Sequence, residues 1–121
     1  MEAKDIIQFF TSILGQVKLY HWTTTKYSKH IALDKLHEEL SEKVDLFIEA
    51  FVGKYKLQPF SNFTITNVST SDTKNIEKFL ESKRSELDSL YKKFNKAQEF
   101  QNIIQDMMSL IDRALYLCNL E

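Results

Sequence analysis

The sequence predicts an all-α fold, a four-helix bundle with few turns. Only two glycines and one proline occur among its 121 residues, and a chain so poor in turn-forming residues favours a few long helices. Apolar residues recur every three or four positions along most of the chain, which is typical of amphipathic helices. At this length we expect one domain, residues 1–121, around a single core.

The first predicted helix covers residues 4–22 and the second covers residues 27–55. The apolar face of the first helix consists of Ile6, Phe9, Phe10, Ile13, Val17 and Tyr20. Thr23, Thr24 and Thr25 then lower helix propensity and predict a break. The second helix carries an apolar stripe of Leu33, Leu36, Leu40, Val44, Phe47 and Phe51. Each stripe is one face of a helix that packs against a core.

A long connection at residues 57–72 separates the second helix from the third. It contains Pro59 and is rich in Ser, Thr and Asn. Because it is long for a link between adjacent antiparallel helices, we expect it to cross over along the length of the bundle. The third helix is predicted at 72–94, with Ser71 or Asp72 as its cap. The fourth is predicted at 98–119.

Composition excludes several classes of protein. The formal charge of −1, with both signs interspersed, gives no electrostatic reason to bind nucleic acid. No apolar run approaches the roughly 18 residues of a membrane span. Asp5 and Gln8 interrupt the first apolar run, so no signal peptide is expected. The single cysteine, Cys118, fits a reducing compartment, and we therefore expect a cytoplasmic protein.

A second, polar stripe flanks the apolar stripe of the second helix. It begins with His30 and Asp34, four residues apart, and ends with Asp45 and Glu49, also four apart. Residues at this spacing share one face of a helix and can bind one ion. His21 ends the first helix and lies on its inward face. Two imidazoles and three carboxylates suit iron, zinc or manganese.

The two pairs cannot serve one ion within one chain. Asp34 and Asp45 are eleven residues apart, which corresponds to about 16 Å along a helix. An antiparallel copy of the second helix, crossing near residues 39–40, would bring His30 and Asp34 of one chain to Asp45 and Glu49 of the other. The spacing therefore predicts a two-fold dimer with two equal sites. His21 could add a ligand to the nearer site.

A di-iron site inside one bundle is the alternative arrangement. It needs Glu-x-x-His motifs on two helices. No such motif occurs in the sequence, and the predicted third and fourth helices contain no histidine. The sequence therefore favours the site between chains.

The motifs resemble those of Dps proteins, the DNA-protection mini-ferritins of the ferritin-like superfamily. The resemblance covers about the first 55 residues and lies in His21-Trp22, His30-x-x-x-Asp34 and Asp45-x-x-x-Glu49. It implies a short, divergent ferritin-like member with a long crossover between its second and third helices. It also implies that these five residues bind ferrous iron between two chains. Peroxide or oxygen would oxidise the iron to its ferric form, which protects against oxidative stress.

Two other questions stay open from the sequence. The protein could instead be a ferritin-like structural or interaction protein with a vestigial metal site, so ferroxidase activity is a hypothesis. The homo-oligomer could extend beyond a dimer to a cage.

No lysine-rich arm precedes the first helix, so the DNA binding of some Dps members is not carried over. His37 matches no family position and is interpreted as structural.

Overall fold

The computed structural model describes residues 3–56 and 75–120. These residues form four helices, α1 (Ala3–Thr23), α2 (Tyr27–Tyr55), α3 (Ile76–Lys93) and α4 (Gln98–Cys118), and no strand. The prediction of an all-α four-helix bundle is confirmed. The predicted crossover at 57–72, and with it the predicted caps Ser71 and Asp72, lie outside the described residues.

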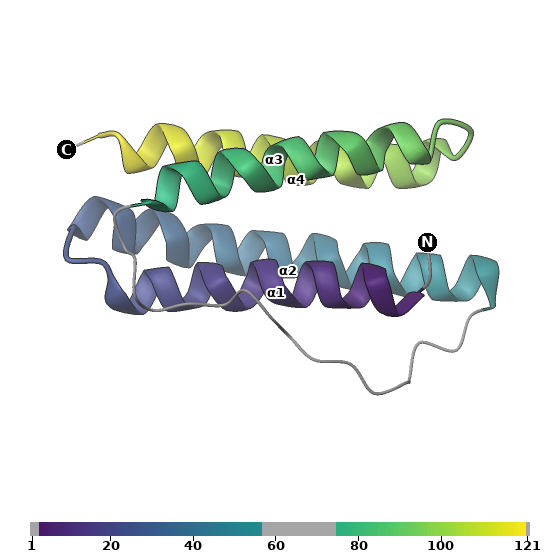
Figure 1. Cartoon of the computed structure of the whole chain (residues 1–121), viewed down its shortest axis with the longest axis horizontal. Coiled ribbons are helices and arrows are strands. Elements are labelled where there is room, and N and C mark those ends of the chain that lie inside the picture. Colours follow the sequence, from purple (N-terminus) through teal and green to yellow (C-terminus); the bar gives the residue numbers. More distant parts are fainter. Residues whose placement is uncertain (1–2, 57–74, 121) are drawn as a thin grey trace.

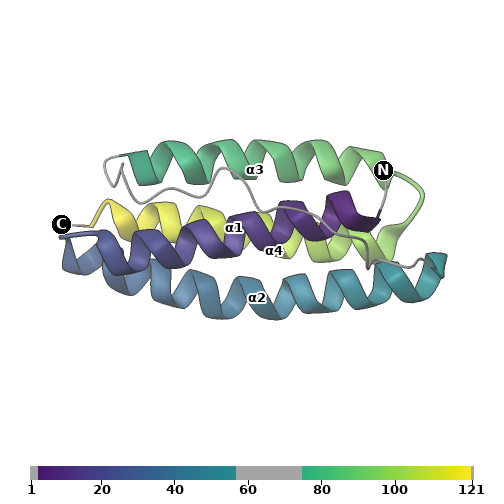
Figure 2. The same cartoon turned by 60° about the horizontal axis from the view of Figure 1, so that its bottom comes forward.

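The helices form two hairpins that pack against each other (Figure 1). α1 and α2 make one antiparallel layer and α3 and α4 the other, and α2 runs in the same direction as α3. α2 packs against both α1 and α4, and α3 packs against α4. Figure 2 shows α2 and α3 at opposite edges of the molecule, with α1 and α4 between them. Among the described helices, none covers the remaining face of α2.

The break between α1 and α2 follows from threonine side chains that compete with the helix for backbone groups. The Thr23 hydroxyl donates to the carbonyl of Leu19 at 2.8 Å. The backbone N–H of Lys26 donates to the hydroxyl oxygen of Thr24 at 3.3 Å. The chain therefore turns within a few residues, and the last turn of α1 lies beside the first turn of α2.

The far end of α2 stops at a left-handed residue. Lys56 has φ 53° and ψ 43°, and its backbone N–H donates to the carbonyl of Val52. This is the usual C-terminal helix cap, although glycine is the residue that most often adopts it.

The core is built around Phe47, which is fully buried on the inner face of α2. The centroid of its ring lies 5.3 Å from the ring centroid of Phe10, 5.6 Å from that of Phe94 and 5.2 Å from that of Phe100. These rings come from α1, the α3–α4 turn and α4, in the edge-on and tilted geometries that aromatic pairs prefer. One side chain thus joins the two hairpins.

Ion pairs join α2 and α4 at the surface of the bundle. Between α2 and α4 they are Glu39–Arg113, Lys43–Asp106 and Lys54–Glu99. Exposed pairs of this kind contribute only about 0–1 kcal/mol each. Burial of the apolar stripes therefore stabilises the fold, and the ion pairs help fix which helices are neighbours. None of the described helices is long and apolar enough to cross a membrane.

Replacing Phe47 with alanine should lower the free energy of unfolding by about 3–5 kcal/mol, because it leaves a cavity where four rings meet. Urea denaturation followed by circular dichroism measures this change. Tyr116→Ala is the matched control, since Tyr116 is an exposed aromatic residue on α4, and it should shift stability by no more than about 0.5 kcal/mol. Equal effects of the two substitutions would contradict the central role of Phe47.

Candidate functional site

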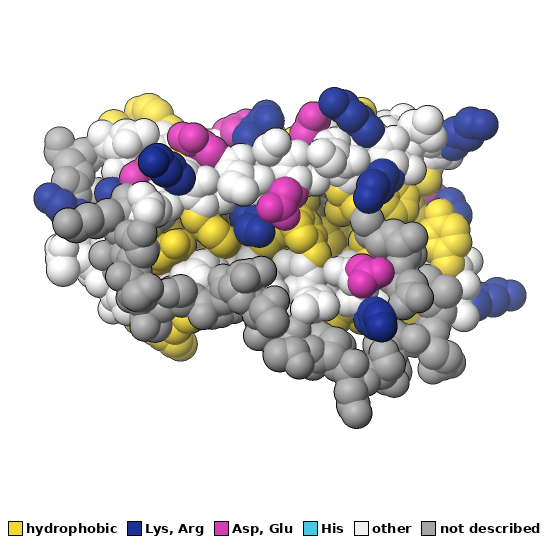
Figure 3. All heavy atoms as spheres, in the orientation of Figure 1, with side chains coloured by type: hydrophobic (Ala, Val, Ile, Leu, Met, Phe, Trp, Pro, Cys, Tyr) yellow, Lys and Arg dark blue, Asp and Glu magenta, His cyan; other side chains and the backbone are white. Residues whose placement is uncertain are grey.

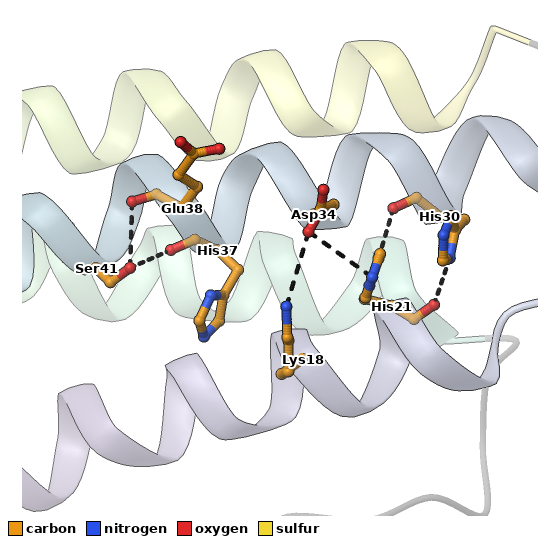
Figure 4. A network of polar contacts seen from close by, with 7 residues as sticks. All are labelled: Lys18, His21, His30, Asp34, His37, Glu38 and Ser41. Carbon is orange, nitrogen blue, oxygen red and sulfur yellow. Dashed lines mark hydrogen bonds and ion pairs between the residues drawn. The ribbon is translucent and has the colours of Figure 1, made fainter.

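The structure brings three of the five predicted ligands together. His21 lies in the last turns of α1, and His30 and Asp34 lie in the first turns of α2. Figure 4 shows the three side chains at the junction of the two helices. Asp45 and Glu49 lie farther along α2, on its exposed side. Among the residues that the structure describes, no group of three or more His, Cys, Asp or Glu side chains is placed to hold one ion.

His21 and His30 hold each other in place. The Nδ1 atom of His21 lies 2.8 Å from the carbonyl oxygen of His30, and the Nδ1 atom of His30 lies 2.8 Å from the carbonyl oxygen of His21 (Figure 4). The two rings are stacked, with centroids 4.0 Å apart and an interplanar angle of 17°. Hereafter this arrangement is called the histidine lock. It joins the end of α1 to the start of α2.

The histidine lock also fixes the tautomer of both rings. A carbonyl oxygen can only accept a hydrogen bond, so each Nδ1 must carry a proton. When an imidazole is neutral, its other nitrogen, Nε2, then has a free lone pair. Metal-binding histidines are commonly oriented in this way, with one ring nitrogen donating to a backbone carbonyl and the other facing the ion. Both rings thus share this hydrogen-bonding feature of metal-binding histidines.

Asp34 lies next to this pair. Its Oδ1 atom is 3.7 Å from Nε2 of His21 and also 3.7 Å from Nζ of Lys18. Two ligands at about 2.1 Å from one ion stand no more than about 4 Å apart, so the His21–Asp34 spacing fits a shared ion. Lys18 is the cation that pairs with Asp34 in the structure. Its amine would have to move aside for a metal.

His37 is a third imidazole near His21 and Asp34, and the sequence alone favours a structural role for it. Figure 4 shows its ring on the side of α2 that faces α1. Burial lowers the pKa of His37 below its usual value, and the Lys18 ammonium and His21 add to this decrease, while Asp34 opposes it. The sequence pattern did not identify Lys18 as a partner of Asp34. Its position three residues before His21 on α1 is the signal that could have found it.

The outward side of α2 carries the remaining acidic residues. Glu38, Glu42, Asp45 and Glu49 are all exposed. None of them forms an ion pair with another described residue. Asp45 and Glu49 are therefore free to bind a cation, but along the helix they lie about three and about four turns from Asp34, respectively.

Cys118 is the one cysteine, and its surroundings make it inert. Its side chain is buried in the core. Burial raises the pKa of the Cys118 thiol to about 11, with a further contribution from the negative charge of Glu77. Thiolate, not thiol, is the reactive and metal-binding form. The structure thus gives Cys118 no role as a nucleophile or ligand.

Two hollows lie away from the histidines, between α1 and α3. One, of about 330 Å³, and another, of about 340 Å³, share Asp5, Phe9 and Glu86 in their walls. On the face shown in Figure 3, hydrophobic side chains are visible between the two helical layers, with charges of both signs around them. The walls of the two hollows contain no histidine or cysteine among the described residues. We therefore place the candidate site at the α1–α2 junction.

A comparison with protein families finds one match. The model of a family described as a family of unknown function (DUF5856) matches residues 21–118. The matched region includes all five predicted ligands. No curated protein and no solved structure matches the chain significantly.

The histidine lock should contribute measurably to the free energy of unfolding. His30→Ala removes one donor and leaves the buried carbonyl of His21 without a partner, so the free energy of unfolding should fall by about 1–3 kcal/mol. His37→Ala is the matched control, because no hydrogen bond of its ring to a described residue is present in the structure. It should cost less than about 1 kcal/mol. If both variants unfold at the same urea concentration, the lock does not stabilise the hairpin.

The thiol of Cys118 should make the protein less stable at alkaline pH. In the unfolded chain the thiol ionises near its ordinary pKa of 9.0, whereas in the folded protein it stays protonated to about 11. Between these values the unfolded state binds fewer protons, so the free energy of unfolding decreases as pH rises. Urea denaturation at pH 8 and pH 10.5 should show a larger decrease for the wild type than for Cys118→Ala. Equal decreases would show that Cys118 does not contribute.

Proposed function

The chain belongs to the family of unknown function DUF5856, and we propose that it is a Dps-like ferroxidase of the ferritin-like superfamily. Its substrate is ferrous iron, bound between two copies of the chain and oxidised by peroxide or oxygen. The observation that carries the proposal is the histidine lock, because both rings use Nδ1 for a backbone hydrogen bond and Nε2 of His21 lies 3.7 Å from the Asp34 carboxylate.

The donor set fits iron. Carboxylates suit both ferrous and ferric ions, and imidazole tolerates both. His21, His30 and Asp34 supply three donors from one chain. Asp45 of the partner subunit and Glu49 of the partner subunit complete the set. Zinc or manganese can occupy the same donors as substitutes.

The direction of the helices agrees with a ferritin-like topology. α2 and α3 run the same way (Figure 1), so α2 ends and α3 begins at opposite ends of the bundle. A long crossover between the second and third helices is the feature that separates ferritin-like bundles from up-down-up-down bundles. This supports the assignment to the superfamily.

The shared site rests on one register of two α2 helices. If they pair antiparallel with the crossing between Glu39 and Leu40, His30 lies opposite the partner's Glu49. In the same register Asp34 lies opposite the partner's Asp45. Two-fold symmetry gives two equal sites, and the exposure of Asp45 and Glu49 leaves them available for a partner.

The reaction is an electron transfer from bound iron. Two ferrous ions each give one electron to one peroxide molecule, which takes up two protons and leaves as two waters. The carboxylates of the site stabilise the extra positive charge on each ferric product. The neutral imidazoles hold the ion without adding charge, and the lock keeps their Nε2 atoms in position.

A second function is supported by the Lys18–Asp34 contact of 3.7 Å. This pair neutralises Asp34 within one chain, and the described residues of a single chain complete no ligand set. A ferritin-like structural or interaction protein with a vestigial site would have these properties. Iron binding separates the two functions.

Purified protein should bind ferrous iron under anaerobic conditions, at about two sites per dimer, and oxidise it when peroxide is added. Asp34→Ala and Asp45→Ala should each weaken binding by about 100-fold or more, since losing even a residue that only supports a ligand weakens metal affinity by about 10–100-fold. Anaerobic titration and absorbance of ferric iron measure both steps. Glu81→Ala, which removes an exposed acidic residue from α3, is the control. Binding no stronger than in buffer alone would eliminate the ferroxidase.

Mixed chains test whether the site is shared. Asp34→Ala and Asp45→Ala chains, once exchanged, should form heterodimers with one intact site and one site that lacks both carboxylates. About half of the wild-type oxidation capacity per heterodimer should return. If the chains exchange and no oxidation returns, the ligands do not come from two subunits.

A further inference from the structure

The exposed face of α2 has the spacing of a helix–helix seam. Its positions alternate between steps of four and three, which is the repeat of paired helices. They are Tyr27, Ile31, Asp34, Glu38, Ser41, Asp45, Ile48 and Val52. Hereafter these eight residues are called the α2 seam. Figure 2 shows α2 along one edge of the molecule, and α1 and α4 are the described helices that pack against it.

The apolar residues of the α2 seam are confined to its two ends. Tyr27 is 78% exposed and Ile31 45% exposed, whereas Ile48 and Val52 are half-buried. In an antiparallel pair centred between Glu39 and Leu40, Tyr27 faces the partner's Val52 and Ile31 faces the partner's Ile48. The predicted ligands give the same centre. Two independent sets of residues therefore fit one register with a second copy of the chain.

The middle of this face is acidic and repels its own copy. Glu38, Glu42, Asp45 and Glu49 have no ion-pair partner among the described residues. Most other described acidic residues do have one, namely Glu39, Glu77, Glu86, Asp88, Glu99, Asp106 and Asp112. Pairing two copies of α2 through this face doubles this unbalanced charge. Like charges brought this close oppose association.

The neighbouring cations do not balance these acids. Lys43 pairs with Asp106 on α4. Lys35 lies on the side of α2 that borders α4, in a hollow with Glu39, Leu110 and Arg113. Lys18 is held at Asp34. The acids at the centre of the face thus need a cation from outside the chain before two copies can meet.

We propose that a divalent metal ion controls dimerisation, so that two chains pair through the α2 seam when the ions are bound and separate when the ions are removed. This inference rests on the proposed shared site. Because the complete ligand set exists only in the dimer, metal binding shifts the equilibrium toward the dimer by mass action. Linkage is reciprocal, so metal affinity increases with protein concentration.

Zinc is the probe of choice, because it does not change oxidation state and measures association without catalysis. Sedimentation velocity of metal-free protein at about 10 µM should show monomer, and saturating zinc should shift it to dimer. The dimer dissociation constant should decrease by about 100-fold or more. EDTA should reverse the shift, and Asp45→Asn should abolish it.

Removing negative charge at the α2 seam (Glu38) and beside it (Glu42), without changing a predicted ligand, gives an independent test. The double variant Glu38→Gln, Glu42→Gln should dimerise more readily in the absence of metal, by about 10-fold or more in dissociation constant, while it still binds zinc. Glu81→Gln removes an unpaired carboxylate from α3 and should behave as wild type. An unchanged dissociation constant in the double variant would show that repulsion across the seam is not what zinc relieves.

The outcomes separate this inference from the proposed function. If the metal-free protein is already a dimer with the same dissociation constant as the zinc form, metal-controlled dimerisation is wrong, although a shared ferroxidase site could still be demonstrated by the mixed chains. If zinc binds the monomer and Asp45→Asn binds it equally well, both the shared site and this inference are wrong. If no divalent ion binds, both are also wrong.

Discussion

Burial of the inner stripe of α2 is the constraint on which the rest of the molecule depends. Phe47 and the apolar residues in line with it face both hairpins at once, so α2 cannot rotate about its axis without exposing the core. A helix of 3.6 residues per turn then has every other position fixed as well. His30, Asp34 and His37 must then lie near the border with α1, whereas Glu38, Glu42, Asp45 and Glu49 must be exposed. The core thereby decides where the predicted ligands lie.

The short turn between α1 and α2 converts this orientation into a preorganised group. Threonine hydroxyls end α1 early enough that His21 lies beside His30. Each imidazole then satisfies a backbone carbonyl of the other helix. A buried histidine usually needs such a partner for structural reasons alone, because an unsatisfied polar group in the core is costly. Here the hydrogen bonds that satisfy the backbone use only the Nδ1 atoms, so one arrangement suits both stability and the proposed metal binding.

Periodicity predicted much of this arrangement and left the pairings open. It gave the helical class, the buried stripe of α2 and the inward side of His21, which is only 8% exposed. It also showed that Asp34 and Asp45 share a side of α2. Periodicity says which way a side chain points and not which atom it meets on another helix. The histidine lock depends on the shape of a three-residue turn, and the contact of Lys18 with Asp34 depends on the offset between α1 and α2. Neither is encoded in the spacing along one helix.

The two halves of the proposed site are electrostatically unequal. Asp34 is already paired with Lys18, whereas Asp45 and Glu49 form no ion pair in the part of the chain that the structure describes. The Asp34 side chain is 56% exposed and that of Lys18 32% exposed, and an ion pair with this much solvent contact is worth about 0–1 kcal/mol. Moving the flexible amine into water therefore costs little against a divalent ion that gains two imidazoles and further carboxylates. The Lys18 contact is therefore compatible with a metal at Asp34 as well as with a vestigial site. In the isolated chain it pairs the Asp34 carboxylate and leaves Asp45 and Glu49 as the unpaired carboxylates among the predicted ligands in the described residues.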